Sequence, residues 1–448
     1  MATVSCKGKA DNAQASAADS TAHPMPDTLR VATLYSPRSY FIYRDEPMGY
    51  DYSLLSDFAE AQHVRLDLEV ATSLKSAIAM LDSGKVDLVA YEVPMTSTYS
   101  DKVLYCGPTS LTEQVLVQPG GAEPITDVTQ LIGKDVYVQG GGKYQQRIEH
   151  LNNELGGGIN IHLIDRDTMI IDDVLAMVAE GQIPLTVVDS DVAQLNKTYY
   201  PNLNITLPLS FKQRASWAVR KDEKWLADSI NAFFGSDAER QQVAQTYRRY
   251  FELSKAMPSA LTYQFNGGVI SPYDNLFRKH AADIDWDWRL MAAQGFVESR
   301  FKNNAVSWAG ARGLMQIMPQ TSRYYGVNPK KLNDPAVSIQ TASKVIATLD
   351  KMFTKYVDDP EERRLFVVAA YNSGAAHILD AIALARKHGL NPQKWKGNVE
   401  KALLMKSQRR YFNDPVVKYG YFRGRETVNY VDQVATFYDR TKKHVPMS

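Results

Sequence analysis

One stretch, residues 286–319, decides the fold of this chain: WDWRLMAAQGFVESRFKNNAVSWAGARGLMQIMP. Between Leu290 and Val297 only Gln294 is polar, which predicts a buried helix. Glu298 follows on the same helix. Burial disfavours a charged carboxylate, so the pKa of an unpaired Glu here is expected to rise. Such a group can hold a proton near neutral pH and act as a general acid. The alternative is an ordinary Glu at the exposed end of a buried helix.

Carboxylates are scarce after this position. The next one is Asp334, and the residues between hold six Lys or Arg side chains. Enzymes that cleave glycosidic bonds normally place two carboxylates around the sugar. The local sequence therefore favours one carboxylate that works alone while the substrate supplies the second group, although a distant partner could still fold in.

Four motifs follow one another along this half of the chain: ESRF (298–301), GLMQIMP (313–319), AYNSG (370–374) and ETVNYV (426–431). In order and spacing they resemble the soluble lytic transglycosylase family. The resemblance implies an all-α, lysozyme-like catalytic domain at 271–448, with Glu298 as the catalytic acid/base. Arg300 and Lys302 beside the acid would lower its pKa. We therefore expect these two side chains to point outward or toward peptide carboxylates.

The chemistry implied by the resemblance is cleavage of peptidoglycan glycan strands without water. Glu298 would protonate the oxygen between N-acetylmuramic acid and N-acetylglucosamine. Its carboxylate would then take the proton of the muramoyl C6 hydroxyl, which closes onto C1 as a 1,6-anhydro ring. No cofactor is implied. The eight scattered His residues show no metal-ligand spacing, so no metal is expected.

The resemblance also assigns substrate-binding roles to six positions: Ser307, Gln316, Met318, Tyr371, Asn372 and Tyr430. Ser307 matches a Ser that hydrogen-bonds the N-acetyl group, and Tyr430 matches a Tyr that orients the carboxylate. Structural alternatives exist, because Met318 could be a core residue and Tyr371 a buried Tyr with a satisfied hydroxyl.

The pattern in the first half of the chain predicts an α/β fold. Strand-like runs such as LRVATL (29–34) and VDLVAY (86–91) alternate with helix-like stretches such as YSLLSDFAEAQH (52–63). A second set of alternating segments follows, and then one long helix at about 225–250. This order predicts a mostly parallel sheet in each of two lobes, with a cleft between the lobes.

Three short segments in this half, MGYD (48–51), SGKVDLV (83–89) and VVDS (187–190), resemble periplasmic solute-binding proteins of the amino-acid type. The resemblance implies a domain at 28–255, with one lobe at about 28–115 and 210–255 and the other at about 116–209. Tyr99 stands where amino-acid receptors usually place an Arg, which argues against a free amino acid. Asp189 matches the residue that holds a ligand's amino group, but it could equally cap a helix. A muropeptide or stem peptide is the expected ligand.

The remaining segments connect or anchor these domains. Residues 256–270 lose periodicity and carry Pro and Gly, which predicts a linker. Residues 1–27 are polar and small, as in a flexible tether. The segment before Cys6 resembles the cleavage site of a bacterial lipoprotein. We therefore expect lipidation of Cys6 and a periplasmic protein held at the inner face of the outer membrane; the alternative is an incidental Cys.

The net charge of +1 conceals an asymmetry. Residues 271–448 carry 28 Lys and Arg against 17 Asp and Glu, so the rest of the chain is acidic. Either the halves dock on each other, or the basic half faces an anionic polymer. Two other functions stay open: a lysozyme-like hydrolase, and a wall-binding receptor with an inactive enzyme domain. A nucleic-acid partner is not expected, because no matching motif occurs.

Overall fold

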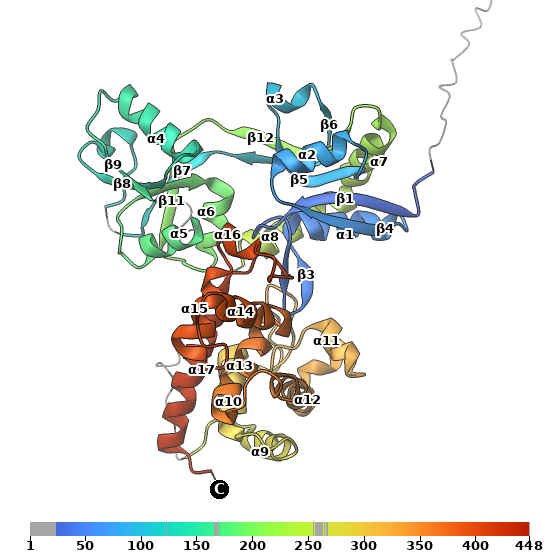
Figure 1. Cartoon of the computed structure of the whole chain (residues 1–448), viewed down its shortest axis with the longest axis vertical. Coiled ribbons are helices and arrows are strands. Elements are labelled where there is room, and N and C mark those ends of the chain that lie inside the picture. The colour runs from blue at the N-terminus through green and yellow to red at the C-terminus, as the bar shows by residue number, and fades with distance from the viewer. Residues whose placement is uncertain are drawn as a thin grey trace, which may run out of the picture.

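The computed structural model describes residues 24–121, 123–164, 169, 171–253, 255, 263, 265 and 268–447. We call described residues 24–255 the N-terminal module and described residues 263–447 the helical module. In Figure 1 the N-terminal module forms two lobes side by side, and the helical module lies beneath them.

The first lobe is built on a five-stranded sheet in the order β4-β1-β5-β12-β6. Its strands are β1 Thr28–Leu34, β4 Arg65–Ala71, β5 Leu88–Pro94, β6 Val103–Thr112 and β12 Gln213–Arg220. Its helices are α1 Tyr50–Ala61, α2 Leu74–Asp82, α3 Ser97–Ser100, α7 Lys224–Gly235 and α8 Asp237–Phe251. The apolar face of α1, formed by Leu54, Leu55 and Phe58, is buried in the core of this lobe, as its helical spacing predicts.

The second lobe has a five-stranded sheet in the order β11-β7-β10-β8-β9. Its strands are β7 Gln114–Pro119, β8 Asp135–Gln139, β9 Asn160–Ile164, β10 Thr186–Asp189 and β11 Leu203–Pro208. Its helical segments are η1 Val128–Leu131, α4 Lys143–Glu154, α5 Ile171–Ala179 and α6 Ser190–Lys197.

Two expectations about the N-terminal module are wrong. Each sheet contains two parallel and two antiparallel strand pairs, so neither is mostly parallel. The chain leaves the first lobe through β6 and returns to it through β12. These two strands run between the lobes in opposite directions and therefore pair antiparallel. The single long helix at 225–250 is two helices, because Ser236 accepts a hydrogen bond from the Glu239 amide and starts α8 as its N-cap.

A short hairpin leaves the first lobe and reaches the helical module. Its strands are β2 Phe41–Tyr43 and β3 Glu46–Met48, paired antiparallel. The two turn residues, Arg44 and Asp45, have φ values of 51° and 60°. Left-handed backbone at both central positions matches the twist of a two-residue hairpin turn. The tip of the hairpin, and hence Arg44, points away from the lobe that carries it.

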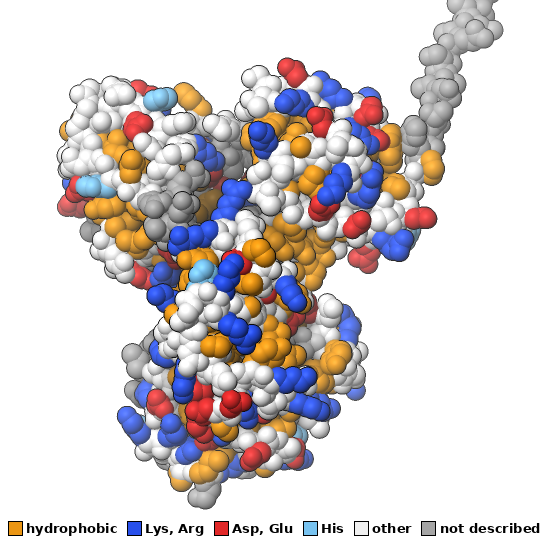
Figure 2. All heavy atoms as spheres, in the orientation of Figure 1, with side chains coloured by type: hydrophobic (Ala, Val, Ile, Leu, Met, Phe, Trp, Pro, Cys, Tyr) orange, Lys and Arg blue, Asp and Glu red, His pale blue; other side chains and the backbone are white. Residues whose placement is uncertain are grey.

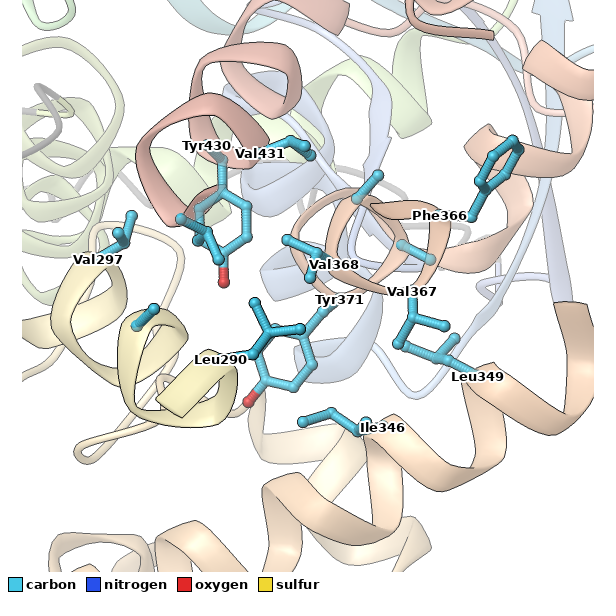
Figure 3. Close-up of a cluster of buried hydrophobic side chains, with 14 of the residues drawn as sticks. Leu290, Val297, Ile346, Leu349, Phe366, Val367, Val368, Tyr371, Tyr430 and Val431 are labelled. Atoms are coloured by element: carbon cyan, nitrogen blue, oxygen red, sulfur yellow. The ribbon is translucent and has the colours of Figure 1, made fainter. Parts of the chain in front are cut away.

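The helical module is arranged around α10. Its larger helices are α9 Asp274–Ala282, α10 Trp288–Ser299, α12 Pro335–Phe353, α13 Pro360–Ser373, α14 Ala375–Lys387 and α17 Gly424–His444. Shorter segments are α11 Pro319–Tyr324, η3 Pro329–Asn333, η4 Trp395–Val399, α15 Glu400–Met405 and α16 Arg409–Phe412. Figure 3 shows part of its core, where side chains of α10, α12, α13 and α17 meet. The expected fold class, a two-lobed α/β domain followed by an all-α domain, is confirmed.

Candidate active site

Glu298 lies in the last turn of α10, and its side chain is only 4% exposed. The helix ends directly after it, because Arg300 and Phe301 take left-handed backbone conformations, with φ of 53° and 62°. Burial raises the pKa of Glu298 above its ordinary value. Arg300 and Lys302 are exposed at the rim of the cavity beside it. The carboxylate is therefore set in the environment that a general acid needs.

Four of the six expected substrate-binding residues share one cavity with Glu298. The cavity has a volume of about 720 Å³, and its lining includes Ser307, Gln316, Asn372 and Tyr430. Met318 and Tyr371 line an adjoining space of about 90 Å³, which also contacts Gln316. Met318 packs in an apolar cluster at the contact between the two modules, as its alternative interpretation anticipates. The sequence motifs thus meet around Glu298, but Met318 and Tyr371 line a different surface from the other four residues.

Several of these polar side chains brace the site. The Gln316 amide donates to the Ala305 and Gly313 carbonyls at 3.1 and 2.8 Å, so it shapes the loop opposite the acid. The Tyr371 hydroxyl donates to the Met315 carbonyl at 2.8 Å. Ser307 accepts from the Ala311 amide at 3.0 Å, and this bond leaves its hydroxyl proton available to a substrate oxygen.

Asn372 and Tyr430 complete the wall behind the acid. The Asn372 side-chain oxygen accepts a 2.7 Å hydrogen bond from the Thr427 hydroxyl, which links α13 to α17. The Tyr430 hydroxyl is buried, and within the described part of the chain no hydrogen-bond partner has good geometry for it. It nevertheless acts to lower the pKa of Glu298, although burial outweighs this effect. A phenol here can stabilise the carboxylate once the proton has left.

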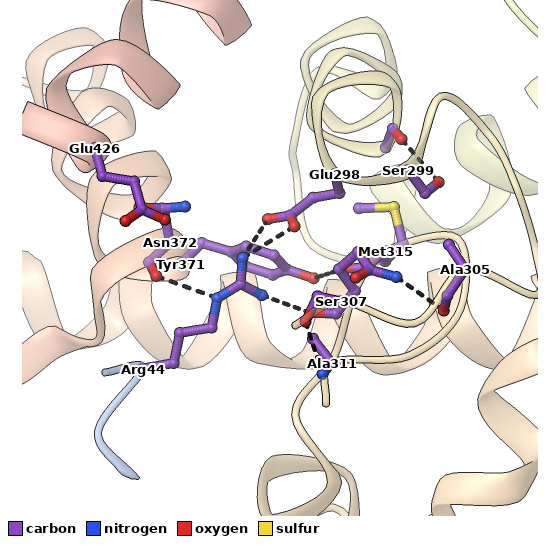
Figure 4. A network of polar contacts seen from close by, with 12 residues as sticks. Arg44, Glu298, Ser299, Ala305, Ser307, Ala311, Met315, Tyr371, Asn372 and Glu426 are labelled. Atoms are coloured by element: carbon purple, nitrogen blue, oxygen red, sulfur yellow. Dashed lines mark hydrogen bonds and ion pairs between the residues drawn. The ribbon is translucent and has the colours of Figure 1, made fainter. Parts of the chain in front are cut away.

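Arg44, which no sequence pattern indicated, forms an ion pair with the Glu298 carboxylate. It comes from the hairpin of the N-terminal module, and its Nη2 lies 3.1 and 2.9 Å from the two Glu298 carboxylate oxygens. The same guanidinium donates to the Asn372 and Gln316 carbonyls at 3.2 and 2.5 Å (Figure 4). Its charge opposes the rise in the pKa of Glu298. Both carboxylate oxygens of Glu298 are therefore in contact with Arg44.

The rest of the hairpin tip is docked on α13 and α14. Asp45 accepts from the Ala375 and Ala376 amides at 3.0 and 3.1 Å, and so caps the first turn of α14. His377 lies 2.9 Å from the Ile42 carbonyl. A Cβ at Gly374 would lie 2.5 Å from an Asp45 carboxylate oxygen. The glycine of the AYNSG motif therefore gives the hairpin room to approach.

A second carboxylate, Glu426, lines the same cavity as Glu298. It belongs to the ETVNYV motif and lies in the first turn of α17. Burial raises its pKa, and the Tyr43 hydroxyl lies 3.5 Å from one of its carboxylate oxygens. The local sequence gave no reason to pair it with an acid more than a hundred positions earlier, because only the packing of α17 on α10 brings them together.

A second cavity of about 710 Å³ lies between the two lobes. Asp189 lines it and is bound by the Lys143 ammonium and, at 3.2 Å, by the Tyr144 hydroxyl. Asp189 stands at the start of α6 but makes no side-chain capping bond there. Tyr99 is not among the cavity residues, because α3 packs it against the apolar core of the first lobe. Arg38 lies in the cleft instead, supplied by the segment after β1.

Cys6, the tether before residue 24 and most of the expected linker lie outside the described residues. Within the described part of the chain, no helix is both long and apolar enough to cross a membrane.

Known families match the chain over most of its length. Residues 29–253 match the bacterial extracellular solute-binding proteins, family 3, and residues 275–393 match the transglycosylase SLT domain. A membrane-bound lytic murein transglycosylase F of Desulfosudis oleivorans is 32% identical over 417 residues, which cover 92% of this chain and 89% of that protein. A protein of the same name from Pseudomonas fluorescens is also 32% identical over 417 residues, with 92% and 84% covered.

Among solved structures, the second substrate-binding domain of GlnP from Lactococcus lactis, in its open conformation, is 17% identical with a TM-score of 0.45. It covers 51% of this chain and 97% of its own. The two family matches lie on the two modules in chain order, and the alignments with both relatives cover 92% of this chain. The chain therefore belongs to the membrane-bound lytic murein transglycosylase F family.

Proposed function

We propose that this protein is a peptidoglycan lytic transglycosylase with Glu298 as its single catalytic acid/base. The observation that carries the proposal is a buried carboxylate with a raised pKa on the wall of a cavity large enough for sugar rings. In its protonated form Glu298 donates to the oxygen between N-acetylmuramic acid and N-acetylglucosamine. Its carboxylate then accepts the C6 hydroxyl proton as that oxygen closes onto C1, so no water is consumed.

The surrounding residues have supporting roles in this proposal. Ser307 donates its free hydroxyl proton to the substrate N-acetyl group, and Tyr430 stabilises the carboxylate between the two proton transfers. Gln316 and Asn372 keep the cavity walls in place through their backbone and side-chain bonds. Met318 and Tyr371 support the cavity wall without contacting the substrate, because neither lines the cavity that holds Glu298.

A hydrolase that adds water at C1 is the second candidate, and Glu426 is the observation that favours it. A carboxylate in the same cavity is what a lysozyme-like enzyme needs as base or nucleophile. Mass spectrometry of digested sacculi separates the two functions. Anhydro ends on the products support the transglycosylase, whereas reducing ends with one added water would reject it in favour of the hydrolase.

We further infer that the docked hairpin is a resting, blocked state of the enzyme. Arg44 holds both oxygens of the acid, and Asp45 fastens the hairpin tip to α14. Residues 35–39 line the cleft between the lobes, and the hairpin begins at Phe41. A ligand that changes the arrangement of the two lobes therefore acts on a segment that lies only a few residues before Arg44.

The proposed ligand of the cleft is a stem peptide or muropeptide of the wall, which would report local substrate. It shifts the balance only by its difference in affinity for the blocked and open states, commonly about 1–3 kcal/mol of coupling. Calorimetry on the full chain with a purified stem peptide tests this idea. Absence of binding would reduce the N-terminal module to a spacer or a docking surface.

For localisation we propose the periplasm, with Cys6 as the attachment point for lipid at the outer membrane. The support is the lipoprotein-like sequence before Cys6 and the name of the relatives as membrane-bound. When the protein is produced with a secretion signal, Cys6→Ser should move from the membrane fraction to the soluble periplasmic fraction. Identical fractionation of both forms would contradict the anchor.

A further inference from the structure

A buried lysine of the helical module lies beside the docked hairpin. Figure 2 shows many Lys and Arg side chains on the surface of this module, but the side chain of Lys406 is 0% exposed. Lys406 follows directly after α15, and α14 and α15 lie at the end of the module that faces the lobes (Figure 1). Because removing an ammonium group from water is costly, a buried Lys needs partners that offset the cost.

Lys406 has two such partners, both on α14. Its ammonium group lies 2.6 Å from a carboxylate oxygen of Asp380 and 2.5 Å from Nδ1 of His377. Asp380 also accepts hydrogen bonds from the Lys418 and Tyr419 amides, both at 2.9 Å. The ion pair is therefore fixed in place by α14 and by the segment that precedes α17.

The contacts of His377 define where its proton lies. Its Nε2 is 2.9 Å from the Ile42 carbonyl oxygen, which can only accept a hydrogen bond, so Nε2 carries the proton. The lone pair of Nδ1 then accepts from the Lys406 ammonium. Burial and the nearby Lys406 charge hold the pKa of His377 well below its ordinary value, so the ring stays neutral. Stacking on the Phe422 ring, with 4.1 Å between centroids, fixes the orientation of the imidazole.

The hydrogen bond from His377 joins the hairpin to the helical module, because Ile42 belongs to β2. Two residues later, the Arg44 amide donates to the Ser373 carbonyl at 3.0 Å, and the Arg44 guanidinium binds the Glu298 carboxylate. With the proton on Nδ1 instead, the imidazole would set one acceptor, Nε2, against another, the carbonyl oxygen. His377 therefore holds the strand that carries Arg44 in one tautomer only.

We propose, on the basis of the blocked state inferred above, that His377 is the latch of the docked hairpin and that Lys406 is the positioning residue that sets it. Lys406 occupies the lone pair of Nδ1 and so keeps the proton of His377 on Nε2. Asp380 holds Lys406 in place and balances its charge. The described lining of the cavity around Glu298 includes none of these three residues, so they act on the acid only through the hairpin.

The first test compares His377→Gln with His377→Phe. A Gln side chain can place an amide N–H where Nε2 lies, whereas Phe keeps a ring against Phe422 but has no donor. Hydrogen exchange of the hairpin, measured by mass spectrometry on the full chain, reports docking because the Arg44 amide is bound to Ser373. Exchange there should be about five- to tenfold faster in His377→Phe, the scale of one lost hydrogen bond. In His377→Gln it should stay close to that of the unaltered protein.

The second test is Lys406→Met, which keeps an unbranched side chain in the buried position but removes the donor. The exposed Lys401 of α15, replaced by Met, is the control. In Lys406→Met the ring-nitrogen NMR signals of His377, identified by their loss in His377→Gln, should show both neutral tautomers. Hydrogen exchange of the hairpin should also be faster. Lys401→Met should change neither quantity.

These results separate the latch from the blocked state. Equal hairpin exchange in His377→Gln and His377→Phe would overturn the latch, and an unchanged His377 tautomer in Lys406→Met would overturn the role of Lys406. Faster exchange together with a severalfold rise in the ligand-free release of anhydro-muropeptides supports both proposals. Faster exchange without any rise in activity would overturn the blocked state and leave the latch standing.

Discussion

Glu298 is subject to two opposing influences that come from different modules. Its own helix buries it and raises its pKa, while Arg44 of the hairpin supplies a positive charge that acts in the opposite direction. The proposed chemistry needs a protonated, accessible acid, so the first influence favours catalysis and the second opposes it. At the residue scale, burial and the ion pair with Arg44 therefore act on the pKa of Glu298 in opposite directions.

Glu298→Gln keeps the shape of the side chain but cannot donate and recover a proton. We expect the release of anhydro-muropeptides to fall about 10²- to 10⁴-fold or more. The measurement is mass spectrometry of digested sacculi, with circular dichroism to show that the variant folds. Release near that of the unaltered protein would remove Glu298 from its role.

Arg44→Ala removes the ion pair without touching the helical module. We expect activity in the absence of ligand to rise severalfold, because the acid becomes accessible. The pKa of Glu298 should rise further once the guanidinium is gone, so the loss of activity with increasing pH should begin at a higher pH. The exposed Arg65, replaced by Ala, is the control for loss of one charge. Unchanged activity and an unchanged pH profile in Arg44→Ala would argue against a blocked state.

At the scale of elements, the β2–β3 hairpin is the connection between the modules that reaches the active site. Its tip makes polar contacts with α13 and α14, and the buried Tyr43 ring packs against Trp308 of the helical module, with 5.4 Å between ring centroids. Asp45 is central, because its carboxylate satisfies two amides at the start of α14 that the helix itself cannot. We therefore expect Asp45 to stabilise the docked hairpin.

Asp45→Ala removes the cap of α14 through a substitution in the N-terminal module. Loss of a capping side chain costs about 0.5–2 kcal/mol, which here weakens the docked state. Activity without ligand should therefore rise, though less than in Arg44→Ala, because the Arg44–Glu298 pair remains. The exposed Asp82, replaced by Ala, is a matched control at a helix end of the same lobe. A fall in activity in Asp45→Ala would mean that the hairpin supports the site instead of blocking it.

At the scale of the whole molecule, the ligand cleft and the active site share two connections. One is the segment from residue 35 to the hairpin, and the other is the wall that the helical module adds to the cleft. Arg423 and Arg425 also bind side chains of the second lobe, at 2.8 Å to Asn196 and 3.2 Å to Asp173. The acidic and basic halves of the chain therefore dock on each other in part through ion pairs, as one of the two charge interpretations anticipates.

Combining ligand and variant tests this connection. Stem peptide should raise the activity of the unaltered chain, whereas Arg44→Ala should respond little, because its acid is already free. Initial rates of sacculus digestion with and without peptide measure both effects. Equal stimulation of the two proteins would show that the ligand acts by a route independent of Arg44.

The sequence by itself determined the fold class and located the four motifs, while catalysis by Glu298 stays a prediction. Glu298 became the candidate acid because it ends an apolar helix and because the four motifs follow it in the order and spacing of a known family. Helical and strand periodicity located most elements, since both patterns arise from neighbours in the chain. Chain order alone did not set strand direction, so the mixed sheets were missed.

Only the tertiary structure decided what reaches each site. Arg44 and Glu298 are 254 positions apart, and the short hairpin between two three-residue strands has no periodic signal. Arg38 in the cleft and Glu426 beside the acid were likewise placed by packing, as was Tyr99 outside the cleft. The physical reason is that local preferences specify elements, whereas contacts between modules depend on how those elements pack across the whole chain.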